Sequence, residues 1–340
     1  MTASTTEDVL EARLSGFLSR HGVTIADLRE EIEDVLGRPL AVVATGSVLQ
    51  GFGNDRSDVD VFVVVDRENL TRLPIMSYQQ TARVDTAYYS AGEVSAWIDR
   101  LSDTSWPYAS PLPGTVWLRQ MRRLHTITRF AAGLVLDAQD EWRERLAGLH
   151  SPWLTDRVVE WWTTEAVRHR TAAGWLADSN PHLAAQRCCD AVLAALERRA
   201  AVAGQLSLTQ KWVPEKLKAV DDADGLALLR DAVKLPQRAV DVGPYVSRCE
   251  EMLEALLPQD AVPTAELHYA RGTEAMPLQD RVLVSRWGMR GVEVPRGVLP
   301  TTGDQVPVWR GRIDATPPAP ALSLFREDML WLSISRANHD

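Results

Sequence analysis

The sequence predicts an α/β (or α+β) domain, then a helical bundle, then a small mixed or β-rich appendage. The residue composition and apolar pattern differ between three parts of the 340-residue chain and indicate this order. Short apolar runs rich in β-branched residues lie in the first part, and long Ala-rich helical patterns fill the middle. Pro, Gly and Arg become frequent in the last part. We therefore expect three domains, covering residues 1–150, 151–258 and 259–340.

The first 150 residues mix helical and strand patterns. Apolar residues recur at helical spacing between residues 7 and 36, and Pro39 ends that pattern. Three apolar stretches with many β-branched or aromatic residues then read as strands: 40–45, 58–65 and 81–90. From there to about residue 149 the chain reads as helices and loops. The alternation of the two element types predicts an α/β domain.

The middle of the chain predicts a helical bundle. Residues 155–178 and 181–204 are long, Ala-rich and helix-periodic, and Pro181 suits the first turn of a helix. Three shorter helical segments follow within residues 210–257. In the appendage, 281–295 and 304–313 read as short strands, whereas 321–334 is compatible with strand or helix.

Composition narrows the classes of function. The net charge is −9, which disfavours nucleic acid as a partner without excluding it. The three cysteines have neither metal-site spacing nor an even count, so neither a zinc site nor a disulfide framework is expected. The sequence has no signal-peptide pattern and no apolar run long enough to span a bilayer. We expect a soluble, cytoplasmic protein, with a homodimer as one option for its oligomeric state.

A glycine turn between two predicted strands suggests a phosphate site, since such turns present backbone N–H groups to anions. In the stretch "VVATGSVLQGFGNDRSDVDVFVVV", a P-loop would need Lys and Ser or Thr where Phe52 and Gly53 stand. A dinucleotide-binding fingerprint would need glycine where Arg56 stands. Both alternatives therefore lack residues that their mechanisms require.

A third arrangement fits. Gly46-Ser47, ten residues, and then Asp58-Val-Asp60 resemble the signature of the nucleotidyltransferase superfamily related to DNA polymerase β. The resemblance is sharpest over residues 40–90 and extends loosely over the helical bundle, as in the branch that modifies aminoglycosides and other small substrates. It implies a third acid on a later strand, and Asp85 in "RVDTAYY" supplies it.

Strand geometry explains why the acids stand where they do. Residues two apart on a strand share a face, so Asp58 and Asp60 project together, about 7 Å apart at Cα. A neighbouring strand about 5 Å away brings Asp85 beside them. Three such carboxylates repel one another unless cations neutralise them, and Mg²⁺ prefers carboxylate and phosphate oxygens. We expect Asp58, Asp60 and Asp85 to bind Mg²⁺, and Gly46 and Ser47 to bind the triphosphate, with Ser47 as the N-cap of a helix.

Other candidate residues carry weaker signals. The resemblance implies that a bundle lysine reaches the triphosphate, and Lys211 is the candidate, although a surface role fits it equally. Glu160 or Glu165 would suit a general base, but both fit a solvated helix face and neither is nominated. A basic cluster near the domain junction would attract a triphosphate or an RNA backbone, or simply form a solvated face: Arg119, Arg122, Arg123, His125 and Arg129.

Together these features predict an Mg²⁺-dependent nucleotidyltransferase. It would move a nucleoside monophosphate from an NTP, ATP being favoured, to a hydroxyl of a small-molecule acceptor and release pyrophosphate. Two alternatives stay open: a transferase acting on tRNA or protein, as toxin-type enzymes do, and a noncatalytic nucleotide-binding protein. The sequence identifies neither the acceptor nor the preferred base.

Overall fold

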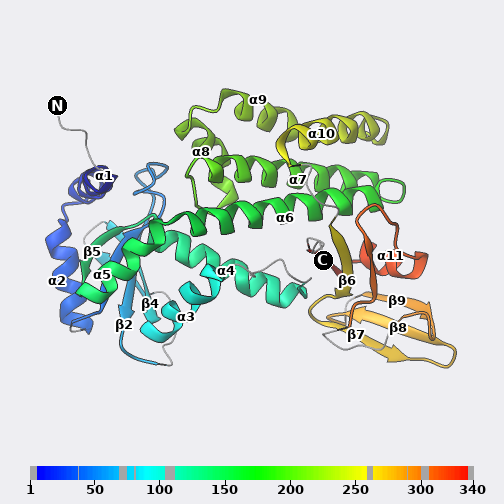
Figure 1. Ribbon diagram of the computed structural model, residues 1–340, viewed down its shortest axis with the longest axis horizontal. Helices are drawn as coiled ribbons and strands as arrows, with labels where there is room; N and C mark the ends of the chain where they lie inside the picture. The colour runs from blue at the N-terminus through cyan, green and yellow to red at the C-terminus, as the bar shows by residue number, and fades with distance from the viewer. Residues whose placement is uncertain are drawn as a thin grey trace. The chain divides into compact units, whose positions relative to one another are not determined.

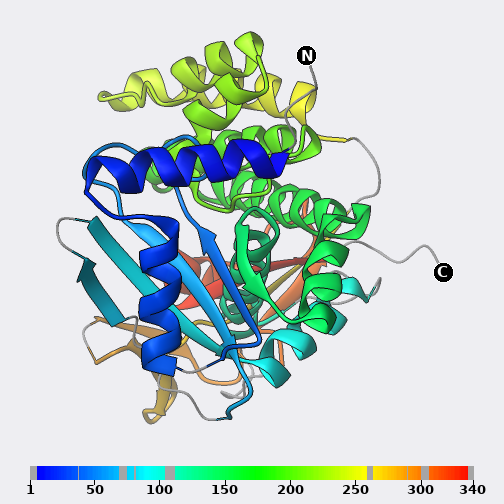
Figure 2. The ribbon, with the colours of Figure 1, turned by 90° about the vertical axis from the view of Figure 1, so that its left-hand side faces the viewer.

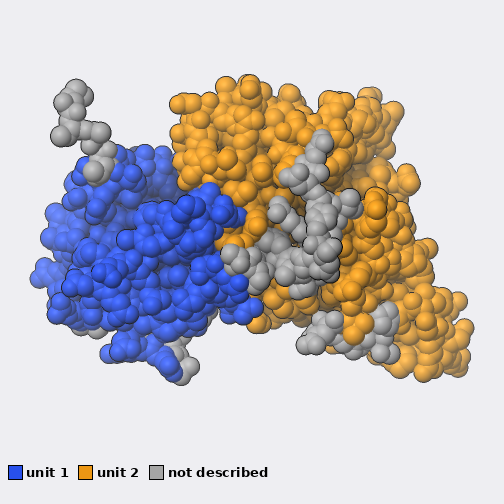
Figure 3. All heavy atoms as spheres, viewed as in Figure 1, with its two compact units in different colours: residues 1–103, 123–156, 206–215 blue, residues 104–122, 157–205, 216–340 orange. Residues whose placement is uncertain are grey.

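The computed structural model describes residues 6–36, 38–68, 75–79, 82–103, 112–258, 263–288, 290–299 and 306–335 (Figure 1). The chain divides into two compact units (Figure 3). Unit 1 comprises residues 1–103, 123–156 and 206–215, and unit 2 comprises 104–122, 157–205 and 216–340. The domain limits at residues 150 and 258 stay predictions.

A five-stranded mixed sheet forms the centre of unit 1. Its order is β3-β4-β2-β1-β5, and only β2 and β4 run parallel. The strands are β1 (Ala41–Thr45), β2 (Val59–Val65), β3 (Ile75–Gln79), β4 (Ala82–Ser90) and β5 (Leu134–Ala138). Strands β1, β2 and β4 match the three predicted ones. Strands β3 and β5 were missed, because runs of only five residues carry little periodicity.

Helices α1 (Thr6–Arg20) and α2 (Ile25–Leu36) cover one face of this sheet, as Figure 2 shows. Their apolar side chains, among them Leu14, Phe17 and Leu28, form one buried cluster with valines of β1 and β2. Helix α2 begins with a reciprocal cap, in which the backbone N–H groups of Thr24 and Asp27 each donate to the other's side chain. The helices predicted from the amphipathic pattern of residues 7–36 thus form the layer that covers this face of the sheet.

The opposite face packs against α3 (Ala91–Ser102) and the C-terminal part of α4 (Gly114–Ala131). Phe62 of β2 lies edge-on to Tyr89 of β4 and Phe130 of α4, with ring centroids 5.0 and 5.1 Å away. Strand β2 is almost continuously buried because both of its faces are covered. Unit 1 also contains α5 (Asp140–Ala147) and the short 3-10 helices η1 (Gly148–His150) and η2 (Gln210–Trp212).

Helices dominate the first part of unit 2. They are α6 (Pro152–Leu176, from residue 157 onward), α7 (Pro181–Val202), α8 (Val213–Ala219, from residue 216 onward), α9 (Ala223–Ala232), η3 (Ala239–Asp241) and α10 (Val242–Leu256). Pro181 opens α7 as predicted, with the Asn180 side chain accepting from the Leu183 N–H. Lys216 Nζ donates to both carboxylate oxygens of Glu197, at 2.7 and 2.6 Å, and both side chains are fully buried.

The C-terminal part of unit 2 is β-rich, as predicted. One sheet has the order β10-β6-β11 and the other β7-β8-β9. The elements are β6 (Thr264–Tyr269), β7 (Thr273–Pro277), β8 (Arg281–Arg286), β9 (Arg290–Pro295), β10 (Trp309–Arg312), α11 (Ala319–Arg326) and β11 (Leu330–Ser335). The ambiguous stretch 321–334 therefore contains most of a helix and then most of a strand. Within the described ranges, no helix is both long and apolar enough to cross a membrane.

Candidate active site

A glycine turn follows β1 at the edge of the unit 1 sheet. Gly46 has φ +101°, and a Cβ added there would lie 2.4 Å from Oδ2 of Asp60. The Gln50 N–H donates to the Gly46 carbonyl, and the Phe52 and Gly53 N–H groups donate to the Ser47 carbonyl. The helix expected after Ser47 is absent, because residues 47–51 form only turns and Gly51 leaves helical geometry at φ +79°. Ser47 is therefore not a helix N-cap.

The register of the sheet brings the predicted acids together. Asp60 of β2 is paired with Thr45 of β1 on one side and with Asp85 of β4 on the other. Asp58 lies just before β2 begins. In its protonated form, Asp85 donates a hydrogen bond to the Asp58 side chain. The three carboxyl groups thus lie close together at the end of the glycine turn.

Burial and neighbouring charges perturb the carboxyl groups of Asp60 and Asp85. Desolvation raises the pKa of Asp60, whereas the charge and hydrogen bond of Arg129 lower it. Desolvation also raises the pKa of Asp85, and the hydrogen bond to Asp58 and the charges of Asp58 and Asp60 raise it further. Burial is the main cause of both shifts, and the neighbouring carboxylates add to it.

Arg129 is the main cation at the acids. Its Nη2 atom lies 2.5 Å from Oδ2 of Asp60, and only about a quarter of the Asp60 side chain is exposed. The guanidinium also lies over the Phe62 ring, 4.5 Å from the centroid. Thr45 Oγ1 donates to the Arg129 carbonyl at 2.9 Å. Arg129 is therefore fixed to β1 through its backbone and to β2 through its side chain.

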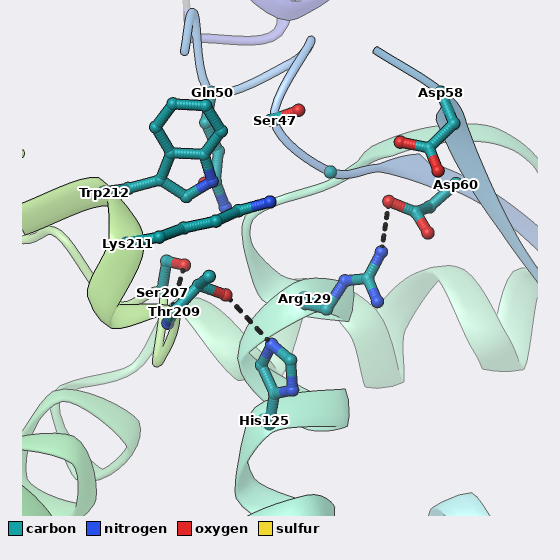
Figure 4. Close-up of a pocket in the computed structure, with 11 residues that line it drawn as sticks. Ser47, Gln50, Asp58, Asp60, His125, Arg129, Ser207, Thr209, Lys211 and Trp212 are labelled. Carbon is teal, nitrogen blue, oxygen red and sulfur yellow. Dashed lines mark hydrogen bonds and ion pairs between the residues drawn. The ribbon is translucent and has the colours of Figure 1, made fainter. Parts of the chain in front are cut away.

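These residues open onto a cavity of about 240 Å³ within unit 1 (Figure 4). Lys211 extends along the Trp212 indole, with its ammonium 5.0 Å from the ring centroid, and points toward the acids. The Phe52 ring lies 5.7 Å from that of Trp212. The lining residues are Gly46, Ser47, Gln50, Asp58, Asp60, His125, Arg129, Ser207, Thr209, Lys211 and Trp212.

The structure therefore places five of the six predicted site residues in the cavity wall, and Asp85 beside two of them. Of the predicted basic cluster, His125 and Arg129 line the cavity. The two candidate bases are engaged elsewhere in unit 2: Glu160 accepts from Arg157 and Glu165 from Arg168. Sequence reasoning missed Gln50, Ser207, Thr209 and Trp212 as lining residues, since no motif marks them. The last three are also remote in the chain from the acids.

The acids suit a divalent cation by chemistry rather than by their present arrangement. Clustered, partly buried carboxylates are the donor set that a hard cation stabilises. Yet among the described ranges no three His, Cys, Asp or Glu side chains are grouped so as to hold a metal ion. One oxygen of Asp60 is instead paired with Arg129. Asp58, Asp60 and Asp85 fit a metal once that oxygen is released.

Comparison with known proteins identifies the domain. Residues 25–100 match the family described as "Nucleotidyltransferase domain". No curated protein matches the chain. A nucleotidyltransferase-like protein from Exiguobacterium sibiricum 255-15 is 12% identical, with a TM-score of 0.41 over 68% of this chain and 74% of that one. The family match covers β1, β2, β4 and all three acids, and the chain therefore contains a domain of the nucleotidyltransferase superfamily.

Proposed function

We propose that this protein is an Mg²⁺-dependent nucleotidyltransferase. It moves a nucleoside monophosphate from an NTP, ATP being favoured, to a hydroxyl of a small-molecule acceptor and releases pyrophosphate. The observation that carries the proposal is the convergence of Asp58, Asp60 and Asp85 beside the Gly46 turn, inside the segment that matches the family.

Each residue has a role in this proposal. Asp58, Asp60 and Asp85 would hold the metal, and Mg²⁺ bound there would neutralise phosphate charge. The Gly46 turn admits phosphate oxygens close to the backbone, since a side chain at that position would meet Asp60. The Ser47 hydroxyl donates to the phosphates, and Lys211 supplies positive charge from the opposite side of the cavity.

The cavity supports a phosphate site more than a whole-nucleotide site. Its volume of about 240 Å³ is below the roughly 300–1,000 Å³ of a typical small-molecule pocket. The phosphates therefore fit inside, and the base lies at the rim. Phe52 and Trp212 provide an aromatic surface there, and a purine stacks well on such rings.

The nature of the acceptor follows from charge. A net charge of −9 opposes a polyanionic acceptor such as tRNA and favours a small molecule. A protein acceptor is the toxin-type alternative. The noncatalytic alternative has one observation in its favour, the Arg129 ion pair on Asp60.

Incubation with labelled NTPs and Mg²⁺ tests the proposal. We expect pyrophosphate release that increases with small hydroxyl-bearing acceptors and falls at least about a hundredfold in Asp58→Asn and Asp60→Asn. Asp55→Asn is the matched control, because Asp55 belongs to the same loop but its side chain is 86% exposed. If only tRNA or protein increased pyrophosphate release, the acceptor would be that macromolecule and not a small molecule. Absence of turnover with every NTP and acceptor would favour the noncatalytic alternative.

A further inference from the structure

The tightest charge pair in the candidate site is not explained by nucleotide transfer alone. Asp60, expected to hold a metal, gives its Oδ2 atom to the Arg129 guanidinium at 2.5 Å. The guanidinium occupies one of the lone-pair sites that this carboxylate offers, and its positive charge lies where a cation on Asp60 would lie. Arg129 and a metal therefore compete for Asp60.

The surroundings of Arg129 hold its backbone firmly and its side chain by exchangeable contacts. Its carbonyl accepts from Thr45, which is paired in register with Asp60. Its side chain contacts the Phe62 ring, which lies two residues beyond Asp60 on the same face of β2. About a fifth of the side chain is exposed, and it reaches the cavity. The guanidinium can therefore change partner without disturbing α4 or the sheet.

The charges at the site favour such an exchange. Three clustered carboxylates without a metal repel one another, and Arg129 stabilises them in the ligand-free protein. A metal would take over that role at Asp60, while the accompanying phosphates bring negative charge into the same cavity. A guanidinium binds phosphate oxygens with two parallel hydrogen bonds, so its partner becomes available when its carboxylate is taken.

We propose that Arg129 occupies the place of a cation on Asp60 in the ligand-free protein and transfers to the triphosphate when metal and nucleotide bind. It is a positioning residue: it keeps Asp60 oriented toward the cavity before the substrate arrives. Only the transfer of Arg129 to the triphosphate rests on the proposed function. Its competition with a metal for Asp60 needs no nucleotide.

Mn²⁺ binding to the nucleotide-free protein, followed by the electron paramagnetic resonance of free Mn²⁺, tests the first half. We expect Arg129→Gln to bind Mn²⁺ about tenfold more tightly than the wild type, because its competitor is gone. Arg143→Gln is the control for net charge: Arg143 donates to the Ala138 carbonyl and is exposed. It should leave Mn²⁺ affinity unchanged.

Calorimetric titration with a nonhydrolysable ATP analogue and Mg²⁺ tests the second half. Arg129→Gln should bind the analogue about tenfold more weakly. Opposite changes in metal and nucleotide affinity separate exchange from a purely structural role, which would weaken both. Arg129→Lys keeps the charge without the planar fork, and should show smaller changes of the same signs if the glutamine variant does not fold.

Two results would overturn the inference. Unchanged or weaker Mn²⁺ binding in folded Arg129→Gln and Arg129→Lys would show that Arg129 does not stand in for a cation. Unchanged analogue binding would show that it does not transfer to the phosphates. Neither depends on turnover: a protein that transfers no nucleotide can still show the Mn²⁺ competition, and an active enzyme can fail to show it.

Discussion

Replacing Gly46 by alanine should destabilise unit 1 and displace Asp60. At φ +101° a non-glycine residue costs about 1–2 kcal/mol. The reduced backbone freedom of the unfolded chain offsets about 0.4–1 kcal/mol of this. The new Cβ would also lie 2.4 Å from Asp60 Oδ2, so the carboxylate must move away from Arg129. Losing that charged hydrogen bond costs about 1.5–3 kcal/mol, which gives a total of about 2–4 kcal/mol.

Gly204 provides the control for backbone strain. It has φ +91°, similar to that of Gly46, and an added Cβ would meet no atom within 4 Å. Gly204→Ala should therefore cost only the strain remaining after the offset, about 0.5–1.5 kcal/mol. Gly16→Ala, inside α1 with open space at its Cβ, should instead stabilise the protein by about 0.5–1 kcal/mol.

Urea denaturation of the three variants measures these differences, and pyrophosphate release measures the consequence for the site. Gly46→Ala should lose turnover by much more than Gly204→Ala at a temperature where both are folded. Equal loss of stability in Gly46→Ala and Gly204→Ala would refute the clash with Asp60. Full turnover in Gly46→Ala would refute the close approach of the phosphates to this turn.

Three further predictions concern the two units separately. Lys216→Met leaves the buried Glu197 carboxylate without the ammonium that contacts both its oxygens, and should cost about 3–5 kcal/mol in urea denaturation; adding Glu197→Gln should recover part of that loss. Burial and two neighbouring arginines lower the pKa of His169 to about 2, so only the unfolded chain takes up this proton below about pH 6.5. Stability should therefore fall as the pH drops from 6.5 toward 2. His169→Gln should flatten this fall, and His150→Gln, at an exposed position, should not. Trp212→Ala should weaken nucleotide binding by about 1–3 kcal/mol in calorimetric titration, without weakening the binding of inorganic triphosphate.

Local signals in the sequence were strongest where a segment is buried on both faces. Strand β2 was predictable because helices cover both of its sides and its side chains are therefore almost all apolar. Strand β5 alternates between buried and half-buried residues over only five positions, too few to stand out. The prediction of a helix after Ser47 was wrong. Gly51 has a positive φ and ends the helical geometry after one turn, and the periodicity of apolar residues does not indicate such a backbone conformation.

The superfamily was predictable from the sequence, because Gly46-Ser47 and Asp58-Val-Asp60 lie within one strand–turn–strand segment and strand geometry fixes their relation. The sequence also indicated Asp85. This residue pairs with Asp60 because their strands, β4 and β2, are neighbours in the sheet. The contact of Arg129 with Asp60, and the place of Ser207, Thr209 and Trp212 in the wall of the same cavity, are visible only in the three-dimensional structure. These contacts join segments that lie far apart in the chain, such as β2 and the C-terminal end of α4. They depend on how helices pack against a sheet, which short-range patterns of apolar and polar residues do not encode.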